Sequence, residues 1–350
     1  MVMNVKGYAA LAVKEDLVPH NFVRRDPRED DVVIDILYSG VCHSDIHNAY
    51  NDWGGAKYPM VPGHEIIGRV VHVGKSVTKF KVGDLAGVGC MVDSCQHCSA
   101  CEQGLEQYCE EGNTLTYNDI DRHDGLPTFG GYSDKIVVTE KFVVKVPEGI
   151  DLRGAAPLLC AGITTWSPLR HWQVGEGSKV AVVGLGGLGH MAIKFANALG
   201  AEVTLFTRSP GKEADARRLG ASHVVLSTDS EQMKATANQF DLIIDTVPYV
   251  HDLNPYIPTL ALSGTLVLVG YLGALDPLLN TVPLILGRRS VAGSVIGGIA
   301  ETQEMMDFCG QHGITADVEV IDIQDINRAW QRMLKSDVKY RFVIDIASLK

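Results

Sequence analysis

A run of glycines near the middle of the chain constrains the fold more than any other feature of the sequence. The run consists of Gly184, Leu185, Gly186, Gly187, Leu188 and Gly189. It directly follows the apolar stretch Val180–Val183 and opens a stretch of helical composition. Glycines at this spacing let the backbone turn tightly and approach a pyrophosphate, which the free N–H groups of a helix start can bind. The motif predicts a strand, a turn and a helix that hold a dinucleotide; a glycine-rich turn without a ligand is the alternative.

The surrounding sequence alternates strand-like and helical segments from Lys179 onward. The strand-like segments read VAVVG, EVTLF, HVVL, DLIIDTV and GTLVLVG. Strands that are apolar along their whole length are typical of a parallel sheet buried on both faces. Residues 154–293 therefore predict a doubly wound α/β domain of the Rossmann type. Residues 1–153 hold short β-like runs punctuated by glycine and proline, which predict a β-rich domain, and residues 294–350 are expected to return to it.

The segment after the second strand of the α/β domain indicates which dinucleotide is bound. Sites for NAD usually place Asp or Glu about twenty residues beyond the glycines, where it binds the ribose 2′-OH. No carboxylate stands between Val203 and Lys212. Instead, the segment offers hydroxyls and cations, which suit a 2′-phosphate: Thr207, Arg208, Ser209 and Lys212. The sequence thus favours NADP(H); cations that are merely solvated are the alternative.

Four of the eight cysteines lie within fifteen residues of one another. They are Cys95, Cys98, Cys101 and Cys109. Four thiolates in one short loop are the donor set that a structural zinc ion prefers, with no coordination position left open. We predict a structural zinc site here rather than disulfides or unligated thiols.

A second set of metal donors is dispersed along the chain. Cys42, His64 and Cys160 together supply two thiolates and one imidazole. Three protein ligands are typical of a catalytic zinc ion, because the fourth position stays free for water or substrate. Buried cysteines and a core histidine are the alternative, since both are common in folded proteins. We expect Cys90 and Cys309 to be buried in apolar packing.

Charge and hydropathy exclude other classes of protein. The formal net charge is −11, and no run of basic residues is present, which argues against nucleic-acid binding. The N-terminal residues lack a basic region followed by an apolar one, and no apolar stretch reaches membrane-spanning length. We expect no membrane association and a cytoplasmic location.

Taken together, these motifs resemble those of the zinc-dependent medium-chain alcohol dehydrogenases, in particular the cinnamyl-alcohol-dehydrogenase-type branch with its aldehyde reductases. The resemblance spans nearly the whole chain in order, through the segments Gly40–Asp45, Val61–Glu65, Gly83–Asp84, the four-cysteine loop, Leu159–Thr164, Gly184–Gly189 and Lys339–Asp345. It implies a β-rich, GroES-like catalytic domain joined to a doubly wound Rossmann domain. It also implies an active site in the cleft between them.

The resemblance assigns roles around the dispersed metal donors. Cys42, His64 and Cys160 match ligands of the catalytic zinc, and Glu65 matches a carboxylate that joins the metal transiently. Asp45 matches the partner that orients the ligand imidazole. Ser44 and His47 match a relay that carries a proton between the zinc-bound oxygen and solvent.

Further positions match contacts with the cofactor and the substrate. Beyond the glycine run and the 2′-phosphate loop, the implied cofactor contacts are His43, Ser44, Thr164, Thr246, Gly270, Ser294, Val295 and Ile296. Trp53 and Ile296 match substrate-pocket positions, and Trp166, close by in the sequence, is expected at the same pocket; core packing is an equal alternative for the two tryptophans.

The resemblance implies an enzyme with two zinc ions per subunit, NADP(H) and a small aldehyde or alcohol as substrate. Zinc would polarise the aldehyde oxygen while NADPH gives the hydride. A homodimer is implied as well, supported by the apolar, glycine-rich stretch Val291–Ile299 near the expected sheet edge. The alternatives are a zinc-free quinone or enoyl reductase of the same fold, and a cofactor-binding structural or regulatory protein.

Overall fold

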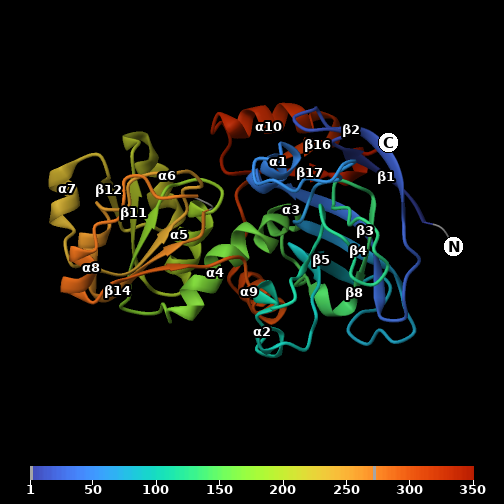
Figure 1. The fold of residues 1–350 in the computed structure, drawn as a ribbon, viewed down its shortest axis with the longest axis horizontal. Coiled ribbons are helices and arrows are strands. Elements are labelled where there is room, and N and C mark those ends of the chain that lie inside the picture. The colour runs from blue at the N-terminus through green and yellow to red at the C-terminus, as the bar shows by residue number, and fades with distance from the viewer. Residues whose placement is uncertain (1–2, 271–272) are drawn as a thin grey trace. The chain divides into compact units, whose positions relative to one another are not determined.

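A computed structural model describes residues 3–270 and 273–350, which divide into two compact units (Figure 1). Unit 1 comprises Met1–Ile163 with Gly297–Lys350, and unit 2 comprises Thr164–Ile296. The boundaries expected at residues 154 and 294 therefore fall somewhat early. The segment before Thr164 stays with unit 1 because Leu159 packs over Gly87, and because Cys160 joins a group of metal donors in that unit.

Unit 2 is built on a six-stranded sheet in the order β12-β11-β10-β13-β14-β15. Its strands are β10 (Lys179–Val183), β11 (Glu202–Thr207), β12 (His223–Leu226), β13 (Phe240–Asp245), β14 (Leu260–Leu268) and β15 (Ser290–Gly293). Every neighbouring pair is parallel. The strand order reverses between β10 and β13, and ligands of such sheets bind at the carboxyl ends of the strands beside this reversal. The predicted doubly wound fold is confirmed.

Helices surround this sheet (Figure 1). They are α5 (Gly189–Ala198), α6 (Glu213–Leu219), α7 (Ser230–Ala235) and α8 (Val282–Gly287), while α4 (Ala161–His171) begins in unit 1 and continues into unit 2. Apolar side chains such as Phe206 and Ile243 fill the core between the sheet and its helices, as fully apolar strands require.

Unit 1 is β-rich, as the short strand-like runs predict. Its main sheet follows the order β16-β17-β3-β4-β5-β9, with β8 paired to β3, and two smaller sheets pair β1 with β2 and β6 with β7. The bounds are β1 (Met3–Ala9), β2 (Val18–Arg24), β3 (Asp31–Val41), β4 (Ile66–Val73), β5 (Leu85–Val88), β6 (Met91–Asp93), β7 (Thr114–Leu115), β8 (Lys135–Thr139), β9 (Val144–Lys145), β16 (Val318–Asp322) and β17 (Arg341–Asp345). Antiparallel pairing of β17 with β3 returns the last part of the chain to the first domain.

Helices complete unit 1. They are α1 (His43–Ala49), α2 (Ser99–Glu102), α3 (Leu152–Ala155), α9 (Ile299–His312) and α10 (Ile326–Leu334). Single 3-10 turns cover Glu106–Tyr108, Glu140–Phe142, Ala156–Leu159, Pro210–Lys212, Ile257–Thr259, Ile323–Asp325 and Ile346–Ser348 across both units. Within the two described ranges, none of the helices combines the length and the apolar character needed to cross a membrane.

Candidate active site

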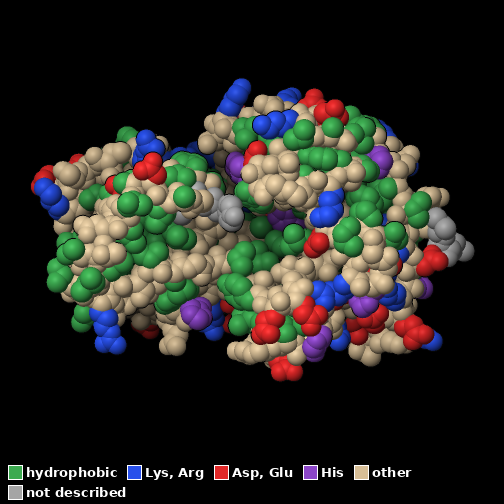
Figure 2. Space-filling view, viewed as in Figure 1, with side chains coloured by type: hydrophobic (Ala, Val, Ile, Leu, Met, Phe, Trp, Pro, Cys, Tyr) green, Lys and Arg blue, Asp and Glu red, His purple; other side chains and the backbone are tan. Residues whose placement is uncertain are grey.

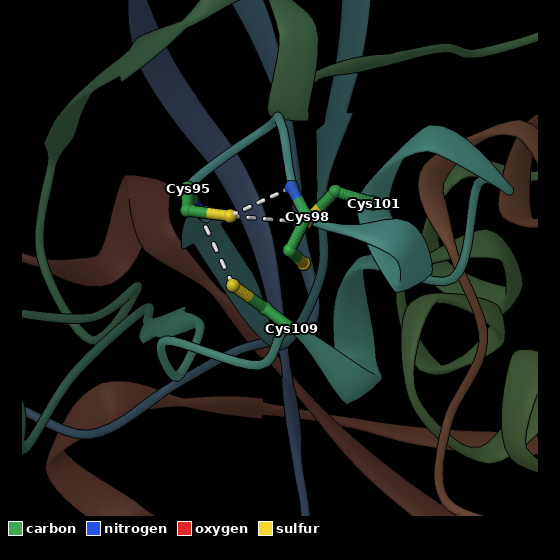
Figure 3. A group of neighbouring side chains, drawn as sticks. All are labelled: Cys95, Cys98, Cys101 and Cys109. Carbon is green, nitrogen blue, oxygen red and sulfur yellow. Dashed lines mark hydrogen bonds between the residues drawn. The ribbon is translucent and has the colours of Figure 1, made fainter.

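The four clustered cysteines converge on one point of their loop (Figure 3). The sulfurs of Cys95 and Cys101 are 3.9 Å apart. Two thiolates bound to one tetrahedral zinc at about 2.3 Å lie roughly 3.8 Å apart, so the loop fits the ion. Backbone N–H groups also point at these sulfurs: those of Cys98 and Glu110 donate to Cys95 and Cys98 at 3.3 and 3.4 Å. Such donors stabilise thiolates, as a metal site requires.

The dispersed donors form a second group in unit 1. The donor atoms of Cys42, His64, Glu65 and Cys160 all lie within 4.8 Å of one another. Cys42 follows β3 and caps α1, His64 and Glu65 precede β4, and Cys160 separates a 3-10 turn from α4. The sulfurs of Cys42 and Cys160 are 4.0 Å apart, again close to the tetrahedral spacing of about 3.8 Å. The fold thus brings the predicted ligands together and supplies a donor set that fits zinc.

Asp45 fixes the orientation of the His64 ring. His64 Nδ1 lies 3.2 Å from Asp45 Oδ1, which leaves Nε2 for a metal. The carboxylate of Asp45 is fully buried and also accepts hydrogen bonds from the backbone N–H groups of Cys42 and Gly63 and from the Tyr132 hydroxyl, at 2.9, 3.1 and 3.0 Å. One carboxylate therefore organises the segments that carry two of the metal donors.

The electrostatics of this group favour a cation. The hydrogen bond between Cys42 and Cys160 lowers the pKa of the Cys42 thiol and raises the pKa of Cys160, so the pair shares a proton that a metal can displace. Burial alone would lower the pKa of His64, but the charge of Asp45 raises it well above its ordinary value. The Asp45 carboxylate and the acidic Cys42 thiol thus surround the imidazole with negative charge.

Glu65 pairs with a buried cation on β17. Arg341 Nη2 donates to Glu65 Oε1, while Oε2 has no hydrogen-bond partner among the described residues. Burial raises the pKa of Glu65 to about 7, against the opposing charge of Arg341. A β-carbon at Gly40 would lie 1.9 Å from Oε2, so only glycine leaves room for this carboxylate. Glu65 Oε2 is therefore available as a further metal ligand beside the other donors.

The two residues of the expected proton relay lie on α1. The Cys42 thiol donates to Ser44 Oγ at 3.6 Å, which places that hydroxyl at the metal group. His47 is three residues further along the same helix face; its Nδ1 lies 2.9 Å from Asp52 Oδ2, and its side chain is partly exposed. His43, at the start of the helix, has a pKa lowered by burial. The relay residues thus run from the metal group toward solvent.

The glycine run in unit 2 has the geometry that its sequence predicts. Gly184 begins the turn after β10 with φ at 89°, a conformation that favours glycine. A β-carbon at Gly189 would lie 2.1 Å from the Gly184 carbonyl oxygen, so the start of α5 can approach the strand only without a side chain. The Thr246 hydroxyl donates to the Val183 carbonyl at 2.8 Å and closes the turn from the β13 side.

The loop after β11 presents the groups expected near a 2′-phosphate. Thr207 is buried at the strand end, and its hydroxyl accepts a hydrogen bond from Ser209 N at 3.1 Å. Arg208 and Ser209 are exposed, and Lys212 precedes α6. The hydroxyls and cations thus stand at the carboxyl edge of the sheet, beside the glycine run.

Other predicted cofactor residues of unit 2 lie in α4 and after the ends of β14 and β15. Thr164 is buried in α4, and Gly270 lies after β14, where a β-carbon would lie 2.4 Å from the Val247 carbonyl oxygen. Ser294, Val295 and Ile296 follow β15; Ser294 N donates to Leu268 O at 3.1 Å. Ile296 is the last residue of unit 2.

The two tryptophans differ in their surroundings. Trp53 is 44% exposed, with its ring 5.1 Å from that of His47, so the core alternative is wrong for this side chain. Trp166 is 1% exposed and packs edge-on against Phe195 within unit 2. For Trp166 we correct the substrate-pocket interpretation: its side chain belongs to the core.

The structure adds residues that sequence reasoning missed. Tyr117 stacks on His64 with ring centroids 5.7 Å apart, Tyr132 binds Asp45, and Arg341 holds Glu65. Cys90 is only half-buried and its thiol donates to the Leu159 carbonyl oxygen at 3.8 Å, so it is not the purely apolar packing residue expected, whereas Cys309 is fully buried. The sequence offered one signal, a cation within the strand-like stretch YRFVIDI, since a cation buried in a strand requires a partner; it did not indicate which partner.

Comparisons with known proteins agree with this geometry. Residues 28–148 match the alcohol dehydrogenase GroES-like domain, and residues 187–311 match the zinc-binding dehydrogenase family. The chain is 51% identical over 348 residues to the aldehyde reductase YahK of Escherichia coli, and 52% identical over 347 residues to the NADP-dependent alcohol dehydrogenase C 1 of Mycolicibacterium smegmatis, with 99% of both chains covered in each case.

Solved structures give the same result. A cinnamyl alcohol dehydrogenase from Sorghum bicolor superimposes with a TM-score of 0.94 at 47% identity, and the enzyme of Helicobacter pylori, solved with NADP(H), with 0.93 at 46%; each match covers 99% of both chains. The chain belongs to the zinc-containing medium-chain alcohol dehydrogenases, within their cinnamyl-alcohol-dehydrogenase-like branch. It is therefore an oxidoreductase with a structural four-cysteine zinc site and a catalytic zinc site.

Proposed function

We propose that this enzyme interconverts aldehydes and primary alcohols with NADP(H), over a broad range of aromatic and aliphatic substrates. The observation that carries the proposal is the donor group itself, in which Cys42, His64 and Cys160 can hold a metal and still leave a coordination position for substrate. When bound, zinc polarises a carbonyl oxygen as a Lewis acid, and the nicotinamide supplies the hydride. The names of the bacterial relatives support the activity and the cofactor.

The chain's own residues orient the metal ligands and move the proton. Asp45 holds the His64 ring so that Nε2 faces the donor group. Ser44, beside the Cys42 sulfur, passes a proton to the product oxygen and regains one through the relay that ends at His47, which exchanges protons with solvent further along α1. Glu65, held by Arg341, keeps one carboxylate oxygen ready to join the metal.

The loop Thr207–Lys212 makes NADPH the preferred cofactor in this proposal. A 2′-phosphate carries about −1.5 to −2 charges near neutral pH, and a carboxylate at this strand end would repel it. Thr207 and Ser209 offer hydroxyls, and Arg208 an exposed guanidinium. Since charge-assisted hydrogen bonds are worth roughly 1.5–3 kcal/mol each, we expect a preference for NADPH on the order of a hundredfold.

The test is the ratio of kcat/KM for NADPH and NADH with one aldehyde, in the wild type and in a Thr207→Asp/Arg208→Ile double variant. The wild type should favour NADPH, and the double variant should shift toward NADH, because it restores a ribose acceptor and removes a cation. Zinc analysis on the same preparations should give two ions per subunit in both proteins. Absence of aldehyde reduction, or a wild-type preference for NADH, would refute the proposal.

We also propose that the enzyme is a homodimer joined through unit 2. β15 is an edge strand of the sheet, and α8 beside it exposes apolar side chains over the part of the surface where Figure 2 shows hydrophobic groups gathered. Those more than half exposed are Leu262, Leu278, Val282, Ile285 and Leu286. An apolar patch beside an open strand edge is typical of an interaction surface. Light scattering at micromolar concentration should give the dimer mass, and a clean monomer would contradict the proposal.

The cysteines support a reducing location for the enzyme, and we propose the cytoplasm. None of the eight, all of which lie in the described ranges, forms a disulfide, and two groups of them are arranged as metal ligands. Free thiolates of this kind persist where thiols are kept reduced. Fractionation of the cells that produce the enzyme, followed by an activity assay, tests this directly.

A further inference from the structure

A histidine outside the metal groups lies between two hydrogen-bond acceptors at the end of β13. His251 Nε2 is 2.8 Å from Asp245 Oδ2, and His251 Nδ1 is 2.9 Å from the Tyr249 carbonyl oxygen. A carboxylate and a carbonyl can only accept, so both ring nitrogens must carry protons for both bonds to form. Burial opposes the charged form, but the Asp245 hydrogen bond raises the pKa of His251 above its ordinary value. The geometry is that of an imidazolium ion.

This pair closes the turn that follows β13. Asp245 is the last residue of the strand and is buried, and its other oxygen accepts from Val247 N at 3.0 Å. His251 therefore ties the far end of the turn to the strand, through the carboxylate and through Tyr249. The segment between Asp245 and His251 is held at both ends by one side-chain pair.

The closed turn lies directly against the glycine run. A β-carbon at Gly184 would meet the side chains of Val247 and Thr246 at 3.1 and 3.2 Å, and one at Gly189 would meet the Thr246 hydroxyl at 3.2 Å. β10 and β13 are the neighbours between which the strand order reverses, and dinucleotides bind at the carboxyl ends of such strands. The turn is thus a wall of the dinucleotide site.

We propose that His251 is a positioning residue for the dinucleotide: with Asp245 it holds the turn Thr246–Val250 against the glycine run, and only its protonated ring makes both bonds. The inference rests on the proposed binding of NADP(H). Because the proton is needed for the closed turn, cofactor affinity is full below the pKa of His251 and falls as pH rises through it.

Other charged or titratable groups lie near the His251 ring and bear on its protonation. Asp252 adds a second negative charge that favours the imidazolium. The Tyr256 ring lies 6.3 Å from His251; burial raises the pKa of the Tyr256 hydroxyl, and the charge of Arg208, after β11, opposes that shift. Asp245 on β13 is the partner in direct contact, so removal of His251 should remove the pH effect.

The same sheet offers a matched control. His223 Nε2 lies 2.9 Å from Glu202 Oε1, a histidine–carboxylate pair of nearly equal length. His223 begins β12 and Glu202 begins β11, so this pair stands at the amino ends of the strands, opposite to the carboxyl ends where a dinucleotide binds. His223→Asn therefore removes similar chemistry without touching the turn.

The experiment measures the dissociation constants of NADPH and NADH by fluorescence titration of the zinc-loaded enzyme, from about pH 6 to pH 9, around the ordinary histidine pKa. We expect His251→Ala to raise the dissociation constants of NADPH and NADH by the same factor, roughly tenfold at the low end of the pH range. His251→Asn, whose amide can still donate to Asp245, should recover part of the affinity but show no pH dependence at this site. Saturating NADPH should restore kcat in both variants, and His223→Asn should bind as the wild type.

Three results separate the inference from the proposed function. If His251→Asn binds NADPH as tightly as the wild type and with the same pH profile, the inference is overturned. The proposed function stands as long as the unmodified enzyme binds NADPH. Loss of NADPH binding alone, with NADH unaffected, would also overturn it, because the turn faces the part that both cofactors share. Failure of the wild type to bind NADPH would overturn the proposed function itself. If His251→Ala melts below the assay temperature, the affinity and pH profile of His251→Asn alone test the inference.

Discussion

The two metal groups of unit 1 use similar donors but are built in different ways. The structural group takes its four thiols from one loop of fifteen residues, whereas the catalytic group draws on three segments between Cys42 and Cys160. The first group is complete once a single loop closes. The second exists only when β3, β4 and the turn before α4 are in place, so its geometry depends on the fold of the whole unit.

The groups also differ in what supports them. Backbone N–H groups of the loop donate to the sulfurs of Cys95 and Cys98, which are partly exposed. The catalytic donors are buried, and charged side chains, Asp45 and Arg341, hold two of them. A loop of this kind stabilises a fold, whereas a buried, side-chain-supported group is suited to orienting ligands around an open position. Variants of the two groups should separate turnover from stability.

The largest effect on turnover should come from Cys42→Ala. It removes a ligand of the catalytic group, and the loss of Lewis-acid stabilisation, worth several kcal/mol, corresponds to a rate decrease of about a thousandfold or more. The melting temperature should change little, because the loop site remains. Cys309→Ala, which removes a buried thiol outside both groups, should keep both zinc ions and most activity. Retention of wild-type kcat by Cys42→Ala would break the distinction between the two groups.

His47→Gln should have the next largest effect and should leave both metal sites intact. Proton transfer by a well-placed group contributes about 10²–10⁴-fold, and since His47 is partly exposed we expect the low end of this range. The decrease in kcat should be greatest in dilute buffer, because external buffer can replace the imidazole. His72→Gln, on the exposed face of β4, is the matched control. Zinc loss from His47→Gln, or full activity in dilute buffer, would contradict the relay.

Asp45→Asn tests whether the catalytic group depends on its buried carboxylate. The carboxylate accepts from Cys42 N, Gly63 N, Tyr132 and His64, whereas an amide would turn one N–H₂ group toward these donors. Partners of metal-bound histidines are typically worth about 10–100-fold in metal affinity or activity. Competition with a chelator should therefore remove one zinc more readily from this variant and the other as slowly as before. Equal loss of both ions would show that the sites are not independent.

The sequence predicted the loop site and the glycine run because each is local. Spacing alone places Cys95 and Cys109 in one loop, and Gly184 and Gly189 around one turn. Long-range partners leave no such trace: the contact of Arg341 with Glu65 depends on the pairing of β17 with β3, which no local pattern encodes. For the same reason the boundary at residue 154 was placed too early, since only the packed structure shows that Leu159 belongs with Gly87.

The burial of individual aromatic side chains was equally beyond the sequence. For both Trp53 and Trp166 the sequence left a substrate pocket and core packing as equal alternatives. In the structure Trp53 lies beside His47 at the surface and Trp166 lies in the core of unit 2. The sequence also did not indicate that the turn held by His251 lies against the glycine run. His251 stands sixty-two residues beyond Gly189, and only the parallel pairing of β10 with β13 brings its turn against the run.

The smallest effect on turnover, and the largest on stability, should come from Cys98→Ser in the loop group. Its thiolate is held by the Glu110 N–H, and its loss leaves three ligands for a structural ion whose binding energy is folding energy. Zinc content should fall from two to one per subunit, and the melting temperature should drop by several degrees, since about 1 kcal/mol shifts the melting of a large domain by roughly 2–4 °C. At low temperature, kcat per zinc-containing catalytic site should stay close to wild type, because the catalytic donors come from other segments. A Cys98→Ser enzyme that melts normally but loses turnover would reverse the roles of the two groups.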